Sequence, residues 1–234
     1  MGSFRFRQFE IMQDRCAMKV GTDGVLLGAW AEGGRRILDI GTGTALIALM
    51  MAQRFPLAGV TGIDIDAEAC GEARENVERS PFAGRVDIVH ARLQEYGGEM
   101  KKYDSIVSNP PFFVNSLKNP GKARSVARHT DTLSFRDLFA GVKRLLVEEG
   151  VFSAIVPVEV VDNFVNEGYI HGFRLTRKCG VKTVARKQPK RYLLAFTRRP
   201  GVRLIEEEQV MMESPDRKSE WYEILTKDFY LQLP

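Results

Sequence analysis

The stretch RILDIGTGTA, residues 36–45, decides the fold. Its first five residues are mostly apolar and predict a buried strand, which runs into a turn with glycines at positions 41 and 43. An apolar, helix-like stretch follows over residues 45–54. Glycine permits a tight turn and a close approach of backbone amides to a ligand, and the start of a helix offers N–H groups that lack intrahelical partners. We therefore expect this turn to bind a nucleotide-like ligand.

Outward from this turn, strand and helix patterns alternate along the chain. Asp66 is a typical N-cap for the helix that follows it, and Gly21-Thr22-Asp23 indicates another helix start upstream. Strands that alternate with helices predict a parallel sheet with helices on both faces. We expect one α/β domain over residues 1–234, a length ample for a single core. Further strands are predicted at residues 59–63, 86–89, 105–107, 151–156 and 192–196, and further helices at residues 67–79 and 135–149.

The distribution of charge is more informative than its total. The net charge is only +4, but residues 171–205 contain eleven Lys or Arg and no Asp or Glu, so the remainder of the chain carries −7. The three cysteines are isolated, which predicts neither a disulfide framework nor a metal site and is typical of the reducing cytoplasm. The first residues lack the pattern of a signal peptide and no apolar run is long enough to span a bilayer, so no membrane association is expected.

The spacing around the glycine turn separates two classes of ligand. Asp64 closes the next strand about 20 residues on, where an acidic residue can bind a ribose. A dinucleotide fingerprint would place a third glycine at position 46, which is Leu46, so NAD is disfavoured. Asp39-x-Gly41-x-Gly43 instead resembles the first motif of class I S-adenosylmethionine-dependent methyltransferases.

This resemblance has implications for both the fold and the cofactor. It implies a Rossmann-like fold with a seven-stranded, mostly parallel sheet, whose last strand is antiparallel, and with helices on both faces. It also implies that S-adenosylmethionine binds at Asp39, Gly41, Gly43, Asp64 and Ile65. A lone Gly-x-Gly pattern would indicate only a turn, so the interpretation depends on a second motif further along the chain.

That second motif is a stiff corner, Asn109-Pro110-Pro111-Phe112, which follows the strand predicted at residues 105–107. The prolines fix their own φ, hold the preceding residues extended and remove two N–H donors. The Asn109 side-chain oxygen and the Pro110 carbonyl remain as acceptors for an NH2 group, and Phe112 can stack on the ring that bears it. The four residues could simply end a strand and fill the core, but after the glycine turn they resemble the fourth motif of amino-methyltransferases. We therefore expect Asn109, Pro110, Pro111 and Phe112 to be catalytic, with Asn109 also contacting the cofactor.

The chemistry that suits such a corner is methylation of an amine whose lone pair is delocalised. Accepting both amine hydrogens favours a pyramidal nitrogen whose lone pair can attack the sulfonium methyl, and fixed geometry lowers the barrier. The target nitrogen can be N6 of adenine, N2 of guanine or the side-chain amide of glutamine.

Longer stretches narrow the resemblance to the bacterial tRNA1(Val) adenine N6-methyltransferase family. They are DRCAMKVGTDG (residues 14–24), LLGAW (26–30), ARHT (127–130) and SEWYEILTKDFYL (219–231), together with Asn-Pro-Pro-Phe. The resemblance covers nearly the whole chain and implies methylation of adenosine 37 in a tRNA. It further implies an N-terminal extension, residues 1–34 or so, that borders the cofactor, with Thr22 and Asp23 at its methionine end. Arg92 departs from the family, which commonly has an acid there to bind the adenine amine. Arginine cannot accept a hydrogen bond, so the backbone or Gln94 would have to substitute, and Arg92 is assigned no role.

Basic residues support an RNA substrate independently of the resemblance. Lys and Arg neutralise the phosphate backbone, and a target base must be extruded or single-stranded to reach the corner. The expected RNA contacts are Lys118, Arg124 and Arg128 in one group and Lys187, Lys190 and Arg191 in a second. A solvated basic face is the alternative, and we favour it for the arginines at positions 198, 199 and 203.

Other functions remain open at this point. An NAD-dependent oxidoreductase would use the glycine turn and Asp64 but would leave Asn-Pro-Pro-Phe without a role. A noncatalytic RNA-binding module would account only for the basic charge. Within methyl transfer, the alternative targets are guanine N2 in rRNA, adenine in DNA and glutamine in a protein, the last of which needs no basic surface.

Overall fold

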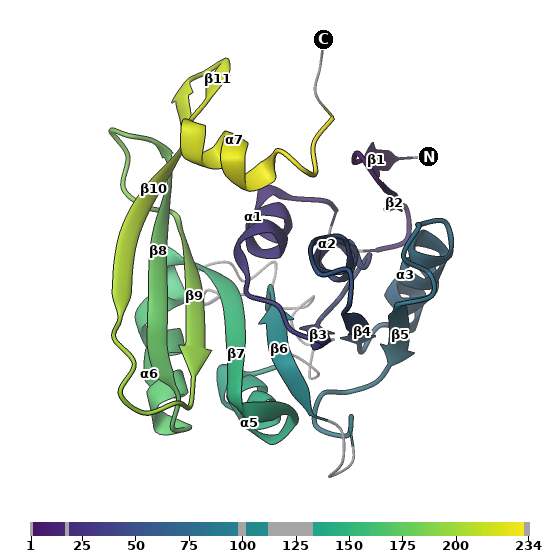
Figure 1. Ribbon diagram of the computed structural model, residues 1–234, viewed down its shortest axis with the longest axis horizontal. Helices are drawn as coiled ribbons and strands as arrows, with labels where there is room; N and C mark the ends of the chain where they lie inside the picture. Colours follow the sequence, from purple (N-terminus) through teal and green to yellow (C-terminus); the bar gives the residue numbers. More distant parts are fainter. Residues whose placement is uncertain (1, 17–18, 98–101, 112–132, 232–234) are drawn as a thin grey trace, which may run out of the picture.

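One sheet with helices on both faces forms the centre of the molecule (Figure 1). The computed structural model describes residues 2–16, 19–97, 102–111 and 133–231. The sheet strands are β3 (Arg36–Ile40), β4 (Gly59–Asp64), β5 (Val86–His90), β6 (Tyr103–Ser108), β7 (Leu146–Pro157), β8 (Arg174–Val184), β9 (Arg191–Thr197), β10 (Ile205–Ser214) and β11 (Arg217–Lys218). Their order is β11-β10-β8-β9-β7-β6-β3-β4-β5. A separate hairpin, β1 (Ser3–Arg5) and β2 (Glu10–Met12), precedes them.

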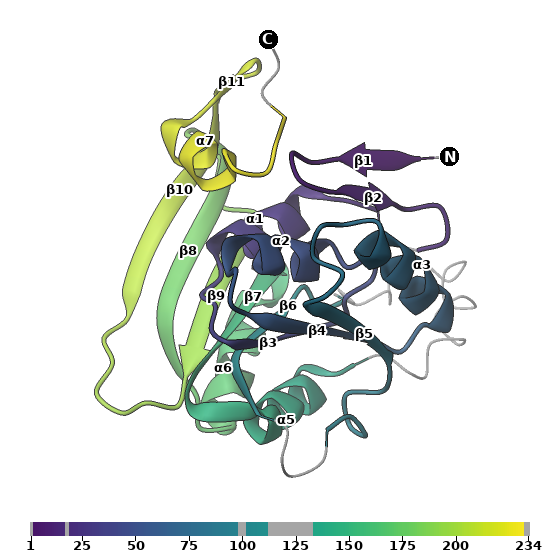
Figure 2. The same ribbon diagram turned by 45° about the vertical axis from the view of Figure 1, so that its right-hand side comes forward.

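The helices divide between the two faces of the sheet, as Figure 2 shows. One face carries α1 (Thr22–Trp30), α2 (Leu46–Arg54) and α3 (Ala67–Glu78), and the other carries α5 (Phe135–Leu145) and α6 (Val161–Ile170). A 3-10 turn, Val158–Val160, leads into α6, and α7 (Glu220–Thr226) packs against α1 and β10. Each face has its own apolar cluster, with Leu49 and Met50 in the first and Phe139 and Phe164 in the second. No helix in the described part of the chain combines the length and the apolar character needed to span a bilayer.

The strand directions confirm the predicted fold class. The pairs β3–β4, β4–β5, β3–β6 and β6–β7 are parallel, and β9 runs antiparallel between β7 and β8. Counted from β3 along the chain, β9 is the seventh strand, so the expected antiparallel last strand of a seven-stranded sheet is present. Two further strands, β10 and β11, extend this sheet beyond β8.

The strand β10 pairs with β8 through its backbone and sets acidic side chains beside basic ones. β10 runs parallel to β8, and three consecutive glutamates of β10 each pair with a basic residue of β8. Lys178 lies 3.2 Å from Glu206, and Arg177 lies 3.7 Å from Glu207. Lys182 pairs in the same way with Glu208. Part of the basic charge that the sequence concentrates in residues 171–205 is therefore paired with acidic side chains of β10.

The helix predicted at residues 135–149 ends at Leu145, so its last turn was predicted wrongly. The backbone becomes extended at Leu146, which pairs with Tyr103 of β6, and Glu148 and Glu149 then lie exposed on the first part of β7. Glutamate and leucine favour helix, but their intrinsic preference is a weak one that tertiary pairing overrides. The strand predicted at residues 151–156 accordingly begins earlier than expected.

The order in which successive strands are added to the sheet reverses between β3 and β6. It forms β3, β4 and β5 in one direction and then returns to place β6 on the other side of β3. In this register Ile40 is opposite Ser108, and the Ser108 hydroxyl donates to the Ile40 carbonyl at 2.9 Å. The residues that follow these two strands therefore emerge side by side, at the topological switch point where open α/β sheets bind ligands.

The predicted N-cap of α3 yields a test of local stability. The Asp66 carboxylate accepts hydrogen bonds from the amides of Glu68 and Ala69, at 2.8 and 3.2 Å. Asp66→Ala should lower the free energy of unfolding by about 1 kcal/mol, because two amides lose their acceptor. Asp66→Ser keeps a capping oxygen and should recover most of the loss in urea unfolding. Equal stability of the alanine variant and the wild type would show that the cap contributes nothing.

Candidate active site

A cavity of about 890 Å³ opens at the carboxyl ends of β3, β4 and β6. It lies at the switch point, so its walls come from segments far apart in the sequence. Among the described residues, the lining comprises Cys16, residues 19–24, residues 40–44, Leu46 and Ile47, residues 63–66, Ala69, residues 91–94, Asn109, Pro111, Leu133, Asp137 and Arg191. The glycine turn, Asp64 and Asn109, which the sequence analysis derived from separate motifs, thus meet in one cavity.

The glycine turn contributes open space to this cavity, and its first three amides are bonded to β4. Gly41 and Gly43 have φ of +72° and +53°, and a Cβ added to Gly41 would meet no atom within 4 Å. The amides of Gly41 and Thr42 donate to the Ile63 carbonyl at 2.9 and 3.0 Å, and the Gly43 amide donates to Asp64 Oδ2 at 2.9 Å. The amides of residues 41–43 are therefore already accepted by β4 in this structure, so a ligand would have to share them. Glycine is needed here for the left-handed backbone and the open space.

Asp39 lies beneath the turn instead of in the cavity wall. Its side chain is fully buried, and the Thr42 hydroxyl donates to Asp39 Oδ2 at 2.7 Å. Burial raises the pKa of the Asp39 carboxyl to about 7, and the charge of Asp64 adds to this effect, whereas the hydrogen bond from Thr42 opposes it. Asp39 is absent from the described lining, so in this structure it supports the shape of the turn.

Asp64 and Ile65 form the wall at the end of β4. Asp64 Oδ2 accepts the Gly43 amide and Oδ1 accepts the Asp66 amide at 3.0 Å, which fixes the carboxylate next to the turn. Ile65 is 41% exposed, an unusual position for a large apolar side chain at the end of a buried strand. Together they offer hydrogen-bond acceptors beside an apolar surface, which is what a nucleoside needs.

The proline corner begins directly beside the glycine turn. Asn109 follows Ser108, whose hydroxyl is bonded to the residue before Gly41, and the Asn109 side chain is half-buried in the cavity wall. Pro110 is buried and Pro111 is exposed at the cavity. Phe112 lies outside the described residues, as do Lys118, Arg124 and Arg128.

Two residues expected in different sites form an ion pair in the same wall. Thr22 and Asp23 open α1, and Asp23 Oδ2 accepts Arg191 Nε at 2.7 Å, with both side chains about one-third exposed. Arg191, expected among the RNA contacts, therefore lies in the cavity wall opposite an expected cofactor residue. Lys187 and Lys190 lie exposed just before it, on the connection from β8 to β9.

Several residues of the wall carry little or no signal in the sequence. Asp137 is in the first turn of α5, where Ser134 caps the helix and donates to Asp137 Oδ2 at 2.8 Å, so the sequence pattern indicates only a helix start. Gln94, expected only as a substitute for Arg92, lies in the cavity wall after β5, two residues beyond Arg92. Cys16 and Lys19 fall within the stretch at residues 14–24 but gave no individual prediction.

Comparison with known proteins identifies relatives over nearly the full chain. The family model described as "Methyltransferase small domain" matches residues 20–155. A protein of Bacteroides thetaiotaomicron named tRNA1(Val) (adenine(37)-N6)-methyltransferase is 46% identical over 234 residues, 98% of each chain. Proteins of the same name from Phocaeicola vulgatus and Tolumonas auensis are 47% and 40% identical, with 98% and 99% of this chain covered and 98% of each relative.

Solved structures agree with the fold class. A protein of Agrobacterium tumefaciens described as a predicted O-methyltransferase superposes with a TM-score of 0.70 at 17% identity, covering 88% of this chain and 96% of that one. A glycopeptide N-methyltransferase in complex with S-adenosylmethionine gives a TM-score of 0.56 at 12% identity, covering 76% and 99%. At these identities the likeness establishes the fold alone.

The open space at Gly41 leads to a test of cofactor binding. Gly41→Ala should weaken binding of S-adenosylmethionine by about tenfold, because the added methyl group projects into the cavity, a loss of about 1.4 kcal/mol. Gly201→Ala is a matched control, since Gly201 has φ of +73° with no atom within 4 Å of its Cβ and lies in the connection from β9 to β10.

Both variants should lose similar stability, about 1–2 kcal/mol, from alanine in a left-handed conformation. Isothermal calorimetry and urea unfolding measure the two effects separately. If both variants lost the same affinity, or neither lost any, the cavity above Gly41 would not be the cofactor site.

Proposed function

Because this chain belongs to the tRNA1(Val) (adenine(37)-N6)-methyltransferase family, we propose that it transfers a methyl group from S-adenosylmethionine to N6 of adenosine 37 in tRNA1(Val). The observation that carries the proposal is the single cavity in which the glycine turn, Asp64 and Asn109 meet. Family membership removes both alternatives outside methyl transfer, an NAD-dependent oxidoreductase and a noncatalytic RNA-binding module. We infer that the enzyme works in the cytoplasm on its tRNA substrate.

The residues of the cavity fit S-adenosylmethionine. Asp64 accepts one backbone amide on each oxygen and keeps further lone pairs for ribose hydroxyls. Exposed Ile65 offers an apolar contact for a flat base, and Gln94 offers an amide oxygen for the adenine amine where Arg92 cannot accept. When bound, S-adenosylmethionine supplies an electrophilic methyl group on a sulfonium.

Asn109 and Pro110 orient the amine that receives the methyl group. The Asn109 side-chain oxygen and the Pro110 carbonyl accept the two N6 hydrogens, which draws the nitrogen towards a pyramidal geometry and localises its lone pair. The buried ring of Pro110 brings no competing N–H donor to this corner. The pairing of Ser108 with Ile40 fixes the corner beside the glycine turn, so positioning contributes to lowering the barrier. The displaced proton leaves along the same acceptors to water.

The rim of the cavity supports an RNA substrate. Within residues 171–205, several basic residues are paired with acids, including those that face β10, Arg199 beside Glu149 and Arg191 beside Asp23. Lys187 and Lys190 stay exposed, and Lys190 directly precedes Arg191 in the cavity wall. A phosphate bound by these two lysines would lie at the mouth of the cavity, as an extruded base requires.

The direct test of the activity is incubation of bulk unmodified tRNA with a labelled methyl donor, followed by nucleoside mass spectrometry. The expected product is N6-methyladenosine, mapped to position 37 of tRNA1(Val). Detection of the labelled methyl group in N2-methylguanosine would show that guanine N2 is the target. Methyl transfer to protein alone would show that RNA is not the substrate.

The role of Asn109 predicts a separation of catalysis from cofactor binding. Asn109→Ala should lower kcat by about 10²–10³-fold, the range found when one preorganised polar contact to the reacting group is removed. The Kd for S-adenosylmethionine should change little. Asn109→Asp keeps two acceptor oxygens and should retain more activity than the alanine variant. Equal losses in kcat and in cofactor affinity would contradict the amine-orienting role.

The role of Lys187 and Lys190 predicts a change in salt dependence. Reversing both charges to glutamate should weaken tRNA binding and reduce the slope of log K against log[salt] by about 1 for each lost phosphate contact. Arg174 and Arg203 provide a charge-matched control, because they are exposed at the opposite edge of the sheet, at the start of β8 and after the end of β9. An unchanged slope in the lysine variant would show that the RNA-binding surface does not include the β8–β9 connection.

A further inference from the structure

We propose that Glu72 and Asn76 of α3 are positioning residues that hold the N-terminal segment, residues 12–16, in place as the support for one wall of the cofactor cavity. Ordering of this segment and binding of cofactor then become coupled. The coupling rests on the proposed function, in which S-adenosylmethionine binds in this cavity. The central measurement, the alkylation rate of Cys16, needs no cofactor.

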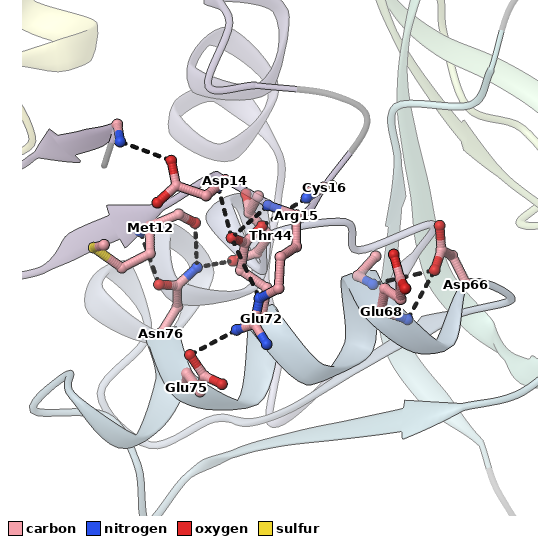
Figure 3. Close-up of polar contacts among 12 residues, drawn as sticks. Met12, Asp14, Arg15, Cys16, Thr44, Asp66, Glu68, Glu72, Glu75 and Asn76 are labelled. Atoms are coloured by element: carbon pink, nitrogen blue, oxygen red, sulfur yellow. Dashed lines mark hydrogen bonds and ion pairs between the residues drawn. The ribbon is translucent and has the colours of Figure 1, made fainter.

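Glu72 binds three consecutive backbone amides of the N-terminal segment, as Figure 3 shows. Its Oε1 accepts the amides of Asp14 and Arg15 at 2.7 and 3.0 Å, and its Oε2 accepts the amide of Cys16 at 2.9 Å. The residue is only 1% exposed. A buried carboxylate is expensive unless it is fully hydrogen-bonded, and here donors come from a segment 56 to 58 residues away in the sequence. The segment and the carboxylate therefore depend on each other.

Asn76, one turn further along α3, joins the same segment to the glycine turn. Its Oδ1 accepts the amide of Met12 at 2.8 Å, and its Nδ2 donates to the carbonyls of Met12 and Thr44 at 2.9 and 3.0 Å. Asn76 is fully buried, and Figure 3 shows it on the same side of α3 as Glu72. One amide side chain thus ties the N-terminal segment to the turn that carries Gly43.

The held segment continues directly into the cavity. Cys16, whose amide is bonded to Glu72, lines the cavity, and a Cβ placed on Gly43 would lie 3.5 Å from Cys16 Sγ. Gln13 Oε1 accepts the amide of Val20 at 2.7 Å, so the segment also fixes the position of the next lining residues before α1. The described part of the segment therefore connects the anchor on α3 with the wall of the cavity at Cys16 and Val20.

An exposed ion pair between Arg15 and Glu75 is a weaker contact between α3 and this segment than the hydrogen bonds of Glu72. Arg15 Nη2 lies 2.6 Å from Glu75 Oε2, but the two side chains are 47% and 44% exposed. Exposed ion pairs contribute little because water screens them. Glu75 therefore offers a variant with the same charge change, on the same helix and beside the same segment, without the buried hydrogen bonds.

The test measures how fast iodoacetamide alkylates Cys16, with peptide mass mapping, in the wild type, Glu72→Gln and Glu75→Gln. Glutamine has the shape of glutamate but places an NH2 group where one oxygen accepts an amide. Glu72→Gln should alkylate Cys16 at least about tenfold faster, as expected when a charge-assisted hydrogen bond is lost, and Glu75→Gln should stay close to the wild type. The Kd for S-adenosylmethionine should rise by a similar factor in Glu72→Gln alone.

Cys70 and Cys179 serve as internal references for global unfolding. Both are fully buried, and burial raises the pKa of their thiols to about 11 and about 12, respectively. Faster alkylation of Cys16 without faster alkylation of Cys70 supports the proposal. An unchanged rate at Cys16, or parallel increases at Cys16 and Cys70, would overturn it, because the latter result is general loss of stability.

A measurement on the wild-type protein avoids any dependence on the variant. S-Adenosylmethionine should slow hydrogen exchange at the amides of residues 14–16, because these amides open when the segment leaves Glu72. Cofactor binding without such slowing would overturn the coupling. Failure of the wild type to bind S-adenosylmethionine would instead overturn the proposed function, and the alkylation result would stand on its own.

Discussion

The parallel pairing of β3 with β6 is the constraint on which the site depends. Ile40 and Ser108 are 68 residues apart, yet their register and the hydrogen bond between them set Gly41 and Asn109 at the same edge of the sheet. In the proposed reaction neither motif suffices alone, because the glycine turn would provide space for the cofactor and the Asn109 corner would provide acceptors for the amine. A shift of one residue in this pairing would turn the Ser108 side chain to the other face and separate the two motifs.

The central part of the fold could be predicted from the sequence, and the reason is burial. Strands such as β3 and β9 are covered by helices on both faces, so they read as continuous apolar runs between turn residues. The start of α3 could be placed because Asp66 is a capping residue whose effect is local. The meeting of Asp64 with the glycine turn also followed from strand order, since the carboxyl ends of parallel strands share one edge.

Features that depend on distant partners could not be predicted in the same way. β8 and β10 carry mostly charged and polar residues, and they are strands because each pairs through its backbone with a distant segment, which also sets basic side chains opposite acidic ones. Counting basic residues therefore overstated the charge available for RNA, and Arg191 was expected on an RNA surface although Asp23 holds it in the cavity wall. The turn amides at positions 41–43 also looked available in the sequence, because nothing local reveals that the Ile63 carbonyl and Asp64 accept them.

The N-terminal segment illustrates this limit most clearly, because its contacts with α3 run through its backbone. Every residue except proline has a backbone amide, so other side chains at positions 14–16 could make the same contacts with Glu72. The sequence of residues 14–16 therefore gives almost no indication of this interaction. The sequence signal of this interaction lies in α3, where Glu72 and Asn76 are buried at positions that an amphipathic helix normally fills with apolar residues. A buried acid on an amphipathic helix therefore indicates a set of backbone donors elsewhere in the chain, and here those donors lead into the cavity that we propose for the cofactor.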